Sequence, residues 1–392
     1  MKWKLLTTLC IFILLIVAFS GCFEEIKNNP TTKSKTLYVD DGGGKEYKII
    51  QEAVNNSSDG DLIFVYNGMY HENLIVNKQI ILVGENKDNV IITSSNENTP
   101  IFNINNQNNV VIENLTVKGS TSSGIWVNNS SDVEIKNCKI YDCYFNGICL
   151  ASCMNCKISS CDISQCGIEK EYIGYFGIGI GSVIFPSSKN SIDRCAIHNN
   201  SYGGIDIFWS NNTENIISNC TIINNNFYGI RCQAETSNNT IENCVILNNK
   251  HGISLKLHCD NCIITHCKIS NSSEIGLEIY YSPESTVTYS TISNNSEGIS
   301  IAGSSNTSIH HNNFINNVGT SSYWTFKNHI DSDGYSVIFF DNGEEGNYWD
   351  DYNGVDADGN GIGDSPYDIT IPLYHEGIFG QDKYPLMNPV DI

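Results

Sequence analysis

Ile135-Lys136-Asn137-Cys138-Lys139-Ile140 returns in nearly the same form as Ile217-Ser218-Asn219-Cys220-Thr221-Ile222 and as Ile241-Glu242-Asn243-Cys244-Val245-Ile246. Aligned on the Cys position, the copies follow one another at steps of 23, 23, 34, 25, 24, 23, 23 and 22 residues. The aligned positions are Leu115, Cys138, Cys161, Cys195, Cys220, Cys244, Cys267, Ser290 and Asn312. A repeat of this length indicates a solenoid, because one unit cannot bury its apolar side alone and must stack on its neighbours.

A second strand signal keeps the same interval. It is a Gly followed by Ile or Leu, which opens a short segment of alternating apolar and polar residues. The pairs are Gly124-Ile125, Gly147-Ile148, Gly177-Ile178, Gly204-Ile205, Gly229-Ile230, Gly252-Ile253, Gly276-Leu277 and Gly298-Ile299. Short strands at a constant interval predict an all-β chain that returns to the same place on each lap, a parallel β-helix (solenoid) with coils of about 22–25 residues.

A third marker lies four residues after the Cys position. Asn side chains there are expected to stack and to bond between coils, which would satisfy backbone groups that a turn leaves open. The residues are Asn199, Asn224, Asn248, Asn271, Asn294 and Asn316.

The start of the repeat region contains the residues of a cap. Ile49-Ile50-Gln51-Glu52-Ala53-Val54 looks like a short helix, and Gly60–Val65 and Ile80–Gly84 look like the first coils. With these segments the chain resembles the right-handed β-helices of the pectin-lyase-like class, in which a capping helix protects the first coil from edge-to-edge pairing. The resemblance implies a right-handed parallel β-helix over residues 37–330 and an acidic C-terminal closing segment over residues 331–392.

Residues 1–21 have the layout of an export signal. Two lysines precede an apolar run from Leu5 to Phe19, and small residues precede Cys22. This order resembles a lipoprotein signal and implies that Cys22 is lipidated; an uncleaved anchor and plain secretion are the alternatives. Residues 22–36 are interpreted as a flexible tether. We therefore expect an extracytoplasmic protein that is held at the cell membrane by a lipid anchor.

The chain has 392 residues, with 43 Asp and Glu against 22 Lys and Arg, and its formal net charge is −21. Such a charge argues against nucleic acids and anionic lipid headgroups as partners.

The chain has sixteen cysteines, a number that would suggest disulfides in an exported protein. Six of them occupy the repeated position, where Cys behaves as a small apolar residue, and we expect these six to be buried and unbridged. Cys143 and Cys166 align on neighbouring coils and are candidates for a disulfide. A four-thiolate zinc site is excluded, because the two Cys-x-x-Cys pairs lie four coils, roughly 19 Å, apart. A local metal site remains an alternative, formed by His258, Cys259, Cys262 and His266.

The closing segment contains Gly346-Asn347-Tyr348-Trp349-Asp350-Asp351-Tyr352 and Asp382-Lys383-Tyr384-Pro385-Leu386. Together with the preceding repeats, these motifs are similar to those of the NosD-like family of exported β-helix proteins, and the likeness runs from about Tyr38 to Pro389. The resemblance implies either a surface protein associated with carbohydrates or an accessory factor for copper-centre maturation. Copper sites prefer soft sulfur or clustered imidazole, so 4 Met and 9 scattered His make copper doubtful.

The same segment predicts calcium binding. Asp356, Asp358, Asn360, Ile362 and Asp364 have the spacing of the first nine positions of an EF-hand-type loop, with side-chain oxygens at positions 1, 3, 5 and 9. Position 12 is Tyr367 and not Glu, so a complete EF-hand is absent. The alternative is that Asp and Asn simply cap turns in a glycine-rich coil.

Candidate catalytic residues come from the position after each Gly-Ile pair, which should face outward. There Asp206 and Arg231 fall on neighbouring coils. They could serve a lyase, with Arg231 as base, or form an exposed ion pair on a polar face. Asp206 and Glu278 are three rungs, about 14 Å, apart, whereas the carboxyl pair of a glycosidase needs about 5–10 Å.

Aromatic residues provide candidates for carbohydrate binding. The 34-residue step inserts Ile168–Phe176, which contains Tyr172, Tyr175 and Phe176, and we expect these residues to lie near Trp209 and to stack on sugar rings. The alternative is a tolerated loop on the flank of the solenoid.

Two functions follow. The preferred hypothesis is a non-catalytic, surface-tethered protein that binds envelope glycans or neighbouring surface proteins. The alternative is a polysaccharide lyase or hydrolase centred on Asp206 and Arg231.

Overall fold

The computed structural model describes residues 34–392 except 97, 169–173, 183, 210, 319, 322–323, 326–329, 333–336 and 371–377. Contacts divide the chain into Met1–Lys35 and Thr36–Ile392, and the described residues lie almost entirely in the second unit. The predicted signal, the lipidated Cys22 and most of the tether fall outside the described residues. Within the described ranges, no helix is long and apolar enough to cross a membrane.

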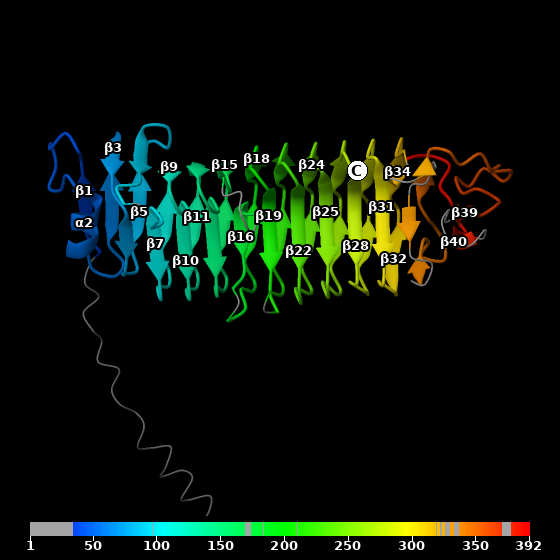
Figure 1. Ribbon diagram of the computed structural model, residues 1–392, viewed down its shortest axis with the longest axis horizontal. Coiled ribbons are helices and arrows are strands. Elements are labelled where there is room, and N and C mark those ends of the chain that lie inside the picture. The colour runs from blue at the N-terminus through cyan, green and yellow to red at the C-terminus, as the bar shows by residue number, and fades with distance from the viewer. Residues whose placement is uncertain are drawn as a thin grey trace, which may run out of the picture. The chain divides into compact units, whose positions relative to one another are not determined.

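Thr36–Ile392 is the predicted parallel β-helix. In the described part of the chain, its strands form three long parallel sheets, and each coil contributes one strand to each sheet in turn (Figure 1). The 13-stranded sheet, called sheet A, contains β1 (Thr36–Val39), β2 (Leu62–Val65), β5 (Ile81–Gly84), β8 (Val111–Glu113), β11 (Glu134–Lys136), β14 (Lys157–Ser159), β17 (Ser191–Asp193), β20 (Ile216–Ser218), β23 (Thr240–Glu242), β26 (Ile263–Thr265), β29 (Thr286–Thr288), β32 (Thr307–His310) and β37 (Ile338–Phe339).

Sheets B and C complete each coil. The 12-stranded sheet B contains β3 (Gly68–His71), β6 (Val90–Thr93), β9 (Thr116–Ser120), β12 (Lys139–Cys143), β15 (Asp162–Cys166), β18 (Ala196–His198), β21 (Thr221–Ile223), β24 (Val245–Leu247), β27 (Lys268–Ser270), β30 (Thr291–Ser293), β33 (Asn313–Ile315) and β38 (Tyr348–Trp349). The 11-stranded sheet C contains β4 (Leu74–Val76), β7 (Phe102–Asn105), β10 (Ile125–Asn128), β13 (Ile148–Ala151), β16 (Phe176–Ile180), β19 (Gly203–Phe208), β22 (Tyr228–Gln233), β25 (His251–Lys256), β28 (Ile275–Tyr280), β31 (Glu297–Ala302) and β36 (Ile330–Ser332).

Three short elements lie outside these sheets. The helix α2 (Ile50–Asn56) buries Ile50, Ala53 and Val54 at the N-terminal end, so the predicted cap is confirmed. Two antiparallel pairs lie towards the C-terminus: β34 (Thr320–Ser321) with β35 (Trp324–Thr325), and β39 (Tyr367–Thr370) with β40 (Ile378–Asp382). Because β36, β37 and β38 still add to sheets C, A and B, the parallel ladders continue past residue 330 into the closing segment.

The repeated Cys is a core residue on every coil that carries it, as predicted. These six thiols are free and at most 2% exposed, and they lie between the inward Ile residues of sheets A and B. Cys143 and Cys166 pair in register on β12 and β15, but both thiols are free. The Gly of the Gly-Ile pairs also has a packing reason, because a Cβ on Gly229 would lie 2.5 Å from the carbonyl oxygen of Gly252 on the next coil.

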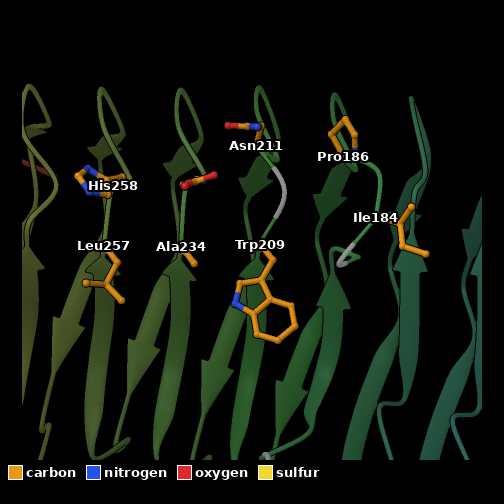
Figure 2. Close-up of a pocket in the computed structure, with 8 residues that line it drawn as sticks. Ile184, Pro186, Trp209, Asn211, Ala234, Leu257 and His258 are labelled. Carbon is orange, nitrogen blue, oxygen red and sulfur yellow. The ribbon is translucent and has the colours of Figure 1, made fainter.

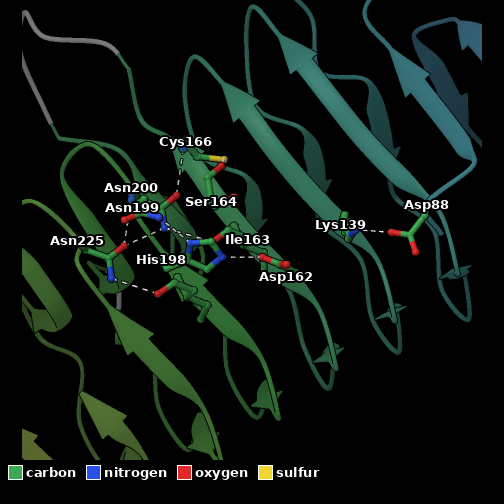
Figure 3. Close-up of polar contacts among 11 residues, drawn as sticks. Asp88, Lys139, Asp162, Ile163, Ser164, Cys166, His198, Asn199, Asn200 and Asn225 are labelled. Atoms are coloured by element: carbon green, nitrogen blue, oxygen red, sulfur yellow. Dashed lines mark hydrogen bonds and ion pairs between the residues drawn. The ribbon is translucent and has the colours of Figure 1, made fainter. Parts of the chain in front are cut away.

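The buried ladder of Asn side chains lies one residue later in each coil than we predicted. Asn199 and Asn224 adopt positive φ and form the turn, while the buried ladder uses the next residue of each coil. Asn225 Oδ1 accepts hydrogen bonds from the backbone N–H of Asn200 at 3.1 Å and from its side-chain amide at 2.9 Å (Figure 3). The left-handed residue turns its side chain toward solvent, so only the following side chain points into the coil; Asn224 and Asn248 still bond at the surface, at 3.1 Å. The buried ladder after sheet B consists of Asn200, Asn225, Asn249, Ser272, Asn295 and Asn317.

Candidate functional site

The outward ladder of sheet C has the predicted register. Asp206 pairs with Arg231, Arg231 with Ser254, and Ser254 with Glu278, on four consecutive rungs from β19 to β28. The alternation of the strand therefore places Asp206 and Arg231 side by side on the outer face, as the sequence indicated.

The Asp206–Arg231 pair is buried, which corrects the expectation of an exposed ion pair. Asp206 is 5% and Arg231 8% exposed, and the guanidinium donates from Nε to Oδ1 and from Nη2 to Oδ2, both at 2.9 Å. Aromatic rings exclude the solvent: the centroids of Phe176, Tyr202 and Tyr228 lie 4.7, 5.5 and 5.1 Å from the guanidinium carbon. Sequence analysis missed this enclosure, because the three rings come from three different coils.

Electrostatics bind the two groups to each other. Burial raises the pKa of Asp206, and the charge of Arg231 opposes that shift. Burial alone would lower the pKa of Arg231, but the charge and hydrogen bonds of Asp206 raise it. Since both carboxylate oxygens of Asp206 are engaged by Arg231, neither residue presents a free acid or base at the surface.

The neighbouring carboxylate, Glu278, is also engaged. Its Oε2 accepts hydrogen bonds from the hydroxyl of Ser254 at 2.9 Å and from the ammonium of Lys256 at 2.9 Å. His251 lies beside it with Nε2 3.1 Å from Glu274 Oε2, and burial lowers the pKa of His251. The carboxylates of this face are therefore engaged, whereas Nδ1 of His251 is buried without a hydrogen-bond partner and lies 3.8 Å from Glu278 Oε2.

The aromatic candidates for carbohydrate binding do not form one group. Tyr172 lies outside the described residues. Tyr175 precedes β16 and packs on Phe145 with ring centroids 4.5 Å apart. Trp209 follows β19 at the other end of the same sheet, six residues or about 20 Å along the strand from Gly203, which pairs with Phe176. The expectation that Tyr175 lies near Trp209 was wrong, because the two residues mark opposite ends of the sheet C strands.

Trp209 instead belongs to a groove along the turns that follow sheet C. The groove has a volume of about 580 Å³. Figure 2 shows its labelled side chains in two rows, one at the strand ends with Ile184, Trp209 and Leu257, and one further along the turns with Asn211 and His258. The groove is lined by Ile184, Pro186, Trp209, Asn211, Ala234, Glu235, Leu257 and His258.

The apolar row is exposed to an unusual degree. Ile184 is 71%, Leu257 47% and Trp209 43% exposed. Scattered apolar residues at a surface are normal, but a contiguous row along a groove is typical of a binding surface.

Backbone conformation makes this row more unusual. The residue directly after each sheet C strand from β7 to β31 takes positive φ, and the early coils use Asn106 and Asn129 there, at 53° and 47°. The groove uses Trp209 at 56° and Leu257 at 59°. The left-handed conformation costs a non-glycine residue about 1–2 kcal/mol and is tolerated best by Asn. This replacement of Asn by bulky residues is visible in the sequence once the coils are aligned, and was the overlooked signal.

The groove carries no basic side chain other than His258 among its described lining residues. Glu235 supplies a carboxylate, and Asn211 supplies an amide. Apolar walls beside a few hydrogen-bonding groups are the usual composition of a small-ligand site.

Among the described residues, the predicted metal sites contain no grouped set of ligands. Across the described ranges, no three His, Cys, Asp or Glu side chains are grouped to hold a metal ion, which includes His258, Cys259, Cys262 and His266. In the closing loop, Asp356 accepts hydrogen bonds from the backbone N–H groups of Gly359, Asn360 and Gly361, which lower its pKa. Asp364 accepts from Ala357 N–H. Calcium binding by this loop stays a prediction.

The comparisons with known proteins agree with this architecture. Residues 123–272 and 255–362 match the family model described as a right-handed β-helix region, which covers more than half of the 392 residues. The chain belongs to this right-handed β-helix family. Residues 54–178 match the model of the periplasmic copper-binding protein NosD, so the expected NosD-like resemblance is confirmed, in the first half of the β-helix and not in the closing motif. No curated protein sequence matches the chain.

Solved structures share the fold at low identity. The A-module of mannuronan C-5 epimerase AlgE4 from Azotobacter vinelandii is 14% identical with a TM-score of 0.61, over 74% of this chain and 88% of the epimerase module. The catalytic unit of a GH87 α-1,3-glucanase from Streptomyces thermodiastaticus is 12% identical with a TM-score of 0.55, over 74% and 63%. PfbA, a surface adhesin of Streptococcus pneumoniae, is 13% identical with a TM-score of 0.53, over 69% and 87%.

The described residues do not fit a copper centre. His310 and His311 are the adjacent imidazole pair, but their Nδ1 atoms lie 2.6 Å from each other and His311 Nε2 contacts Glu345 at 2.7 Å. The two rings therefore contact each other and a carboxylate, and among the described residues no His or Cys side chain joins them to form a group of three.

Proposed function

We propose that this protein is an extracytoplasmic polysaccharide-binding β-helix that does not modify its ligand. The observation that carries the proposal is the exposed apolar groove beside Trp209 and Leu257, with hydrogen-bonding groups along its second row. Sugar rings present apolar faces and hydroxyl edges, and such a surface offers partners for both.

The comparisons support the ligand class. Two structural neighbours are named as enzymes acting on polysaccharides, and a third is named as a surface adhesin. The family model that matches residues 54–178 is named for a periplasmic protein, which supports a place outside the cytoplasm. The order of residues 1–22 supports a lipid anchor at Cys22.

A catalytic role is less favoured. Asp206 has both oxygens bound to Arg231, and Glu278 is held by Ser254 and Lys256. Hydrolysis of a glycosidic bond needs two carboxyl groups about 5–10 Å apart with one of them free to transfer a proton.

The test combines binding and turnover. The mature protein should bind immobilised polysaccharides, and incubation should release neither reducing ends nor unsaturated uronates. Turnover that is abolished by Asp206→Asn would overturn the proposal in favour of a lyase or hydrolase. The anchor is tested separately: the wild-type protein should partition with membranes, and Cys22→Ala should release it or leave it unprocessed.

A further inference from the structure

The groove is built on three consecutive rungs. Trp209, Ala234 and Leu257 directly follow β19, β22 and β25, and these strands are paired neighbours in sheet C. At about 4.8 Å per rung, the backbones of Trp209 and Leu257 are about 10 Å apart along the stack. The residue between them has the smallest side chain of the three, and it leaves a gap between two large apolar groups (Figure 2).

The first end of the groove is shaped by a longer turn. The segment from β16 to β17 has 10 residues, against 6 between β22 and β23 or between β25 and β26. This extra length brings Ile184 and Pro186 to the lining. Ile184 and Pro186 of this longer turn therefore line one end of the groove, and Leu257 and His258 line the other end.

The charge of the site selects the ligand. The groove offers Glu235 and no Lys or Arg among its described lining residues, and the whole chain carries −21. Uronates, phosphates and sulfates would be repelled, because long-range potentials act on the approach of charged ligands. Carboxylate, amide and imidazole groups can all bond to hydroxyl groups.

We propose that this groove binds a neutral hexose polymer that lies along the solenoid axis, with one sugar ring against Trp209, the next ring over Ala234, and the third ring against Leu257. The spacing of about 10 Å from two rungs is close to the length of two linked hexopyranose rings. Asn211, Glu235 and His258 bond to hydroxyl groups along the edge of the chain. This inference rests on the proposed function and names its site and ligand class.

The positive φ of the residue directly after each sheet C strand from β7 to β31, a position called the positive-φ column, bears on the choice of residues in the groove. Asn is the residue that earlier coils use at the same turn, so a purely structural turn would be at least as stable with Asn as with Trp or Leu. In the groove, the apolar side chains of Trp209 and Leu257 at this position fit a contact outside the fold, whereas Tyr281 holds the same position outside the groove. Strained residues of this kind concentrate at ligand-binding sites.

The experiment substitutes Trp209→Asn and Leu257→Asn in the full chain, each copying the residue that earlier coils carry. Tyr281→Asn is the matched control: Tyr281 occupies the same column at φ 48° and is 49% exposed, but it does not line the groove. Binding is measured by affinity electrophoresis with laminarin and mannan as neutral probes and polygalacturonate as the acidic probe. Both groove variants should lose at least tenfold in affinity for the neutral probe and keep or raise the melting temperature, and the control should bind like wild type.

A filling variant gives an independent measurement. Ala234→Leu closes the gap without removing either wall, so it should also weaken binding at least tenfold. If neutral probes bind wild type and all variants equally, the groove assignment is wrong while the proposed function stands. Preference for polygalacturonate overturns the neutral ligand class, and a large fall in melting temperature for Trp209→Asn assigns the tryptophan to folding. If no polysaccharide binds, both the proposed function and this inference fail.

Discussion

The indole N–H of Trp349 donates a hydrogen bond to Asp382 Oδ2 at 2.8 Å, and this contact closes the C-terminal end of the solenoid. Trp349 ends β38, the last strand of sheet B, and its ring is stacked between Phe314 and Tyr367 with both centroids at 4.4 Å. Asp382 ends β40 and also accepts from the backbone N–H of Asn347 at 2.7 Å. The two halves of the closing motif, around Trp349 and Asp382, therefore contact each other over the last coil.

The buried Asp382 makes stability depend on pH. Burial raises its pKa to about 6, above the ordinary value of 3.8. Because the native state then holds its proton more tightly than the unfolded state, this group's contribution to stability is largest below about pH 4 and is lost as pH rises through 6. Two pKa units correspond to about 3 kcal/mol.

Asp382→Asn should remove that contribution. The amide stays neutral, so the difference in free energy of unfolding between variant and wild type should shift in the variant's favour by up to about 3 kcal/mol between pH 4 and 7. Urea unfolding across that range is the measurement. Asp391→Asn, an exposed change of the same charge, is the control. Parallel pH profiles for wild type and Asp382→Asn would contradict the assignment.

The buried cysteines of the coils, of which Cys259 and Cys262 are examples, should be unreactive. Burial raises the pKa of Cys259 to about 11 and of Cys262 to about 12, which suppresses the thiolate that reacts. A thiol reagent should label the cysteines of the folded β-helix slowly and label all of them after unfolding in urea, as read by mass spectrometry. Rapid labelling of the native coils would contradict the register.

Serine should be tolerated at the repeated Cys position better than at a typical core position. Ser290 occupies the same column naturally, and its hydroxyl donates to the carbonyl of Thr288 at 2.9 Å. Cys220 contacts the equivalent carbonyl, that of Ser218, at 3.1 Å. Cys220→Ser should therefore cost only about 1 kcal/mol, at the low end for a buried hydroxyl.

The fold could be predicted because its determinants repeat. Inward Ile, the core Cys and the crowded Gly each recur on one coil after another, so their spacing alone fixes the strands and their parallel stacking. The displaced Asn ladder shows the limit of that reasoning. Whether Asn199 or Asn200 points inward depends on which residue adopts the left-handed turn, and both residues are Asn.

The candidate site could be predicted only in part. The neighbouring positions of Asp206 and Arg231 follow from the period, but their burial depends on Phe176, Tyr202 and Tyr228, which reach over them from separate coils. Which residues line the groove depends on whether a turn residue lies before or after its sheet C strand. Tyr175 and Trp209 were grouped by aromatic character, and the length of the strand separates them.

Calcium binding by the closing loop is tested by chelation. If Asp356, Asp358, Asn360 and Asp364 bind calcium with the carbonyl of Ile362, a chelator should lower the melting temperature, because a ligand that binds only the native state stabilises it. Asp356→Ala with Asp358→Ala should abolish that sensitivity. The hydrogen bonds that Asp356 accepts from its own turn represent the alternative, a loop closed without an ion. An unchanged melting curve in chelator at neutral pH would support that alternative and exclude calcium.

The Asp206–Arg231 pair should behave as a single structural unit. Arg231→Met leaves the Asp206 carboxylate buried without its partner, and breaking a buried pair in this way costs about 3–5 kcal/mol. The double variant Asp206→Leu with Arg231→Met removes both charges and keeps apolar groups against the rings of Phe176 and Tyr228. It should recover most of the lost stability, because replacing a buried ion pair by apolar residues of similar volume is often nearly neutral.

Urea unfolding of wild type, both single variants and the double variant completes the cycle, and glycan binding is measured on the same four proteins. Strong coupling between the two changes, with binding retained in the double variant, is the expected result, since the groove lies at the ends of the strands and the pair lies at their middle. Additive losses of stability would mean that the two charges do not depend on each other. A stable double variant that no longer binds glycan would instead place the ligand over the ion pair, and would move the binding site from the turns to the face of sheet C.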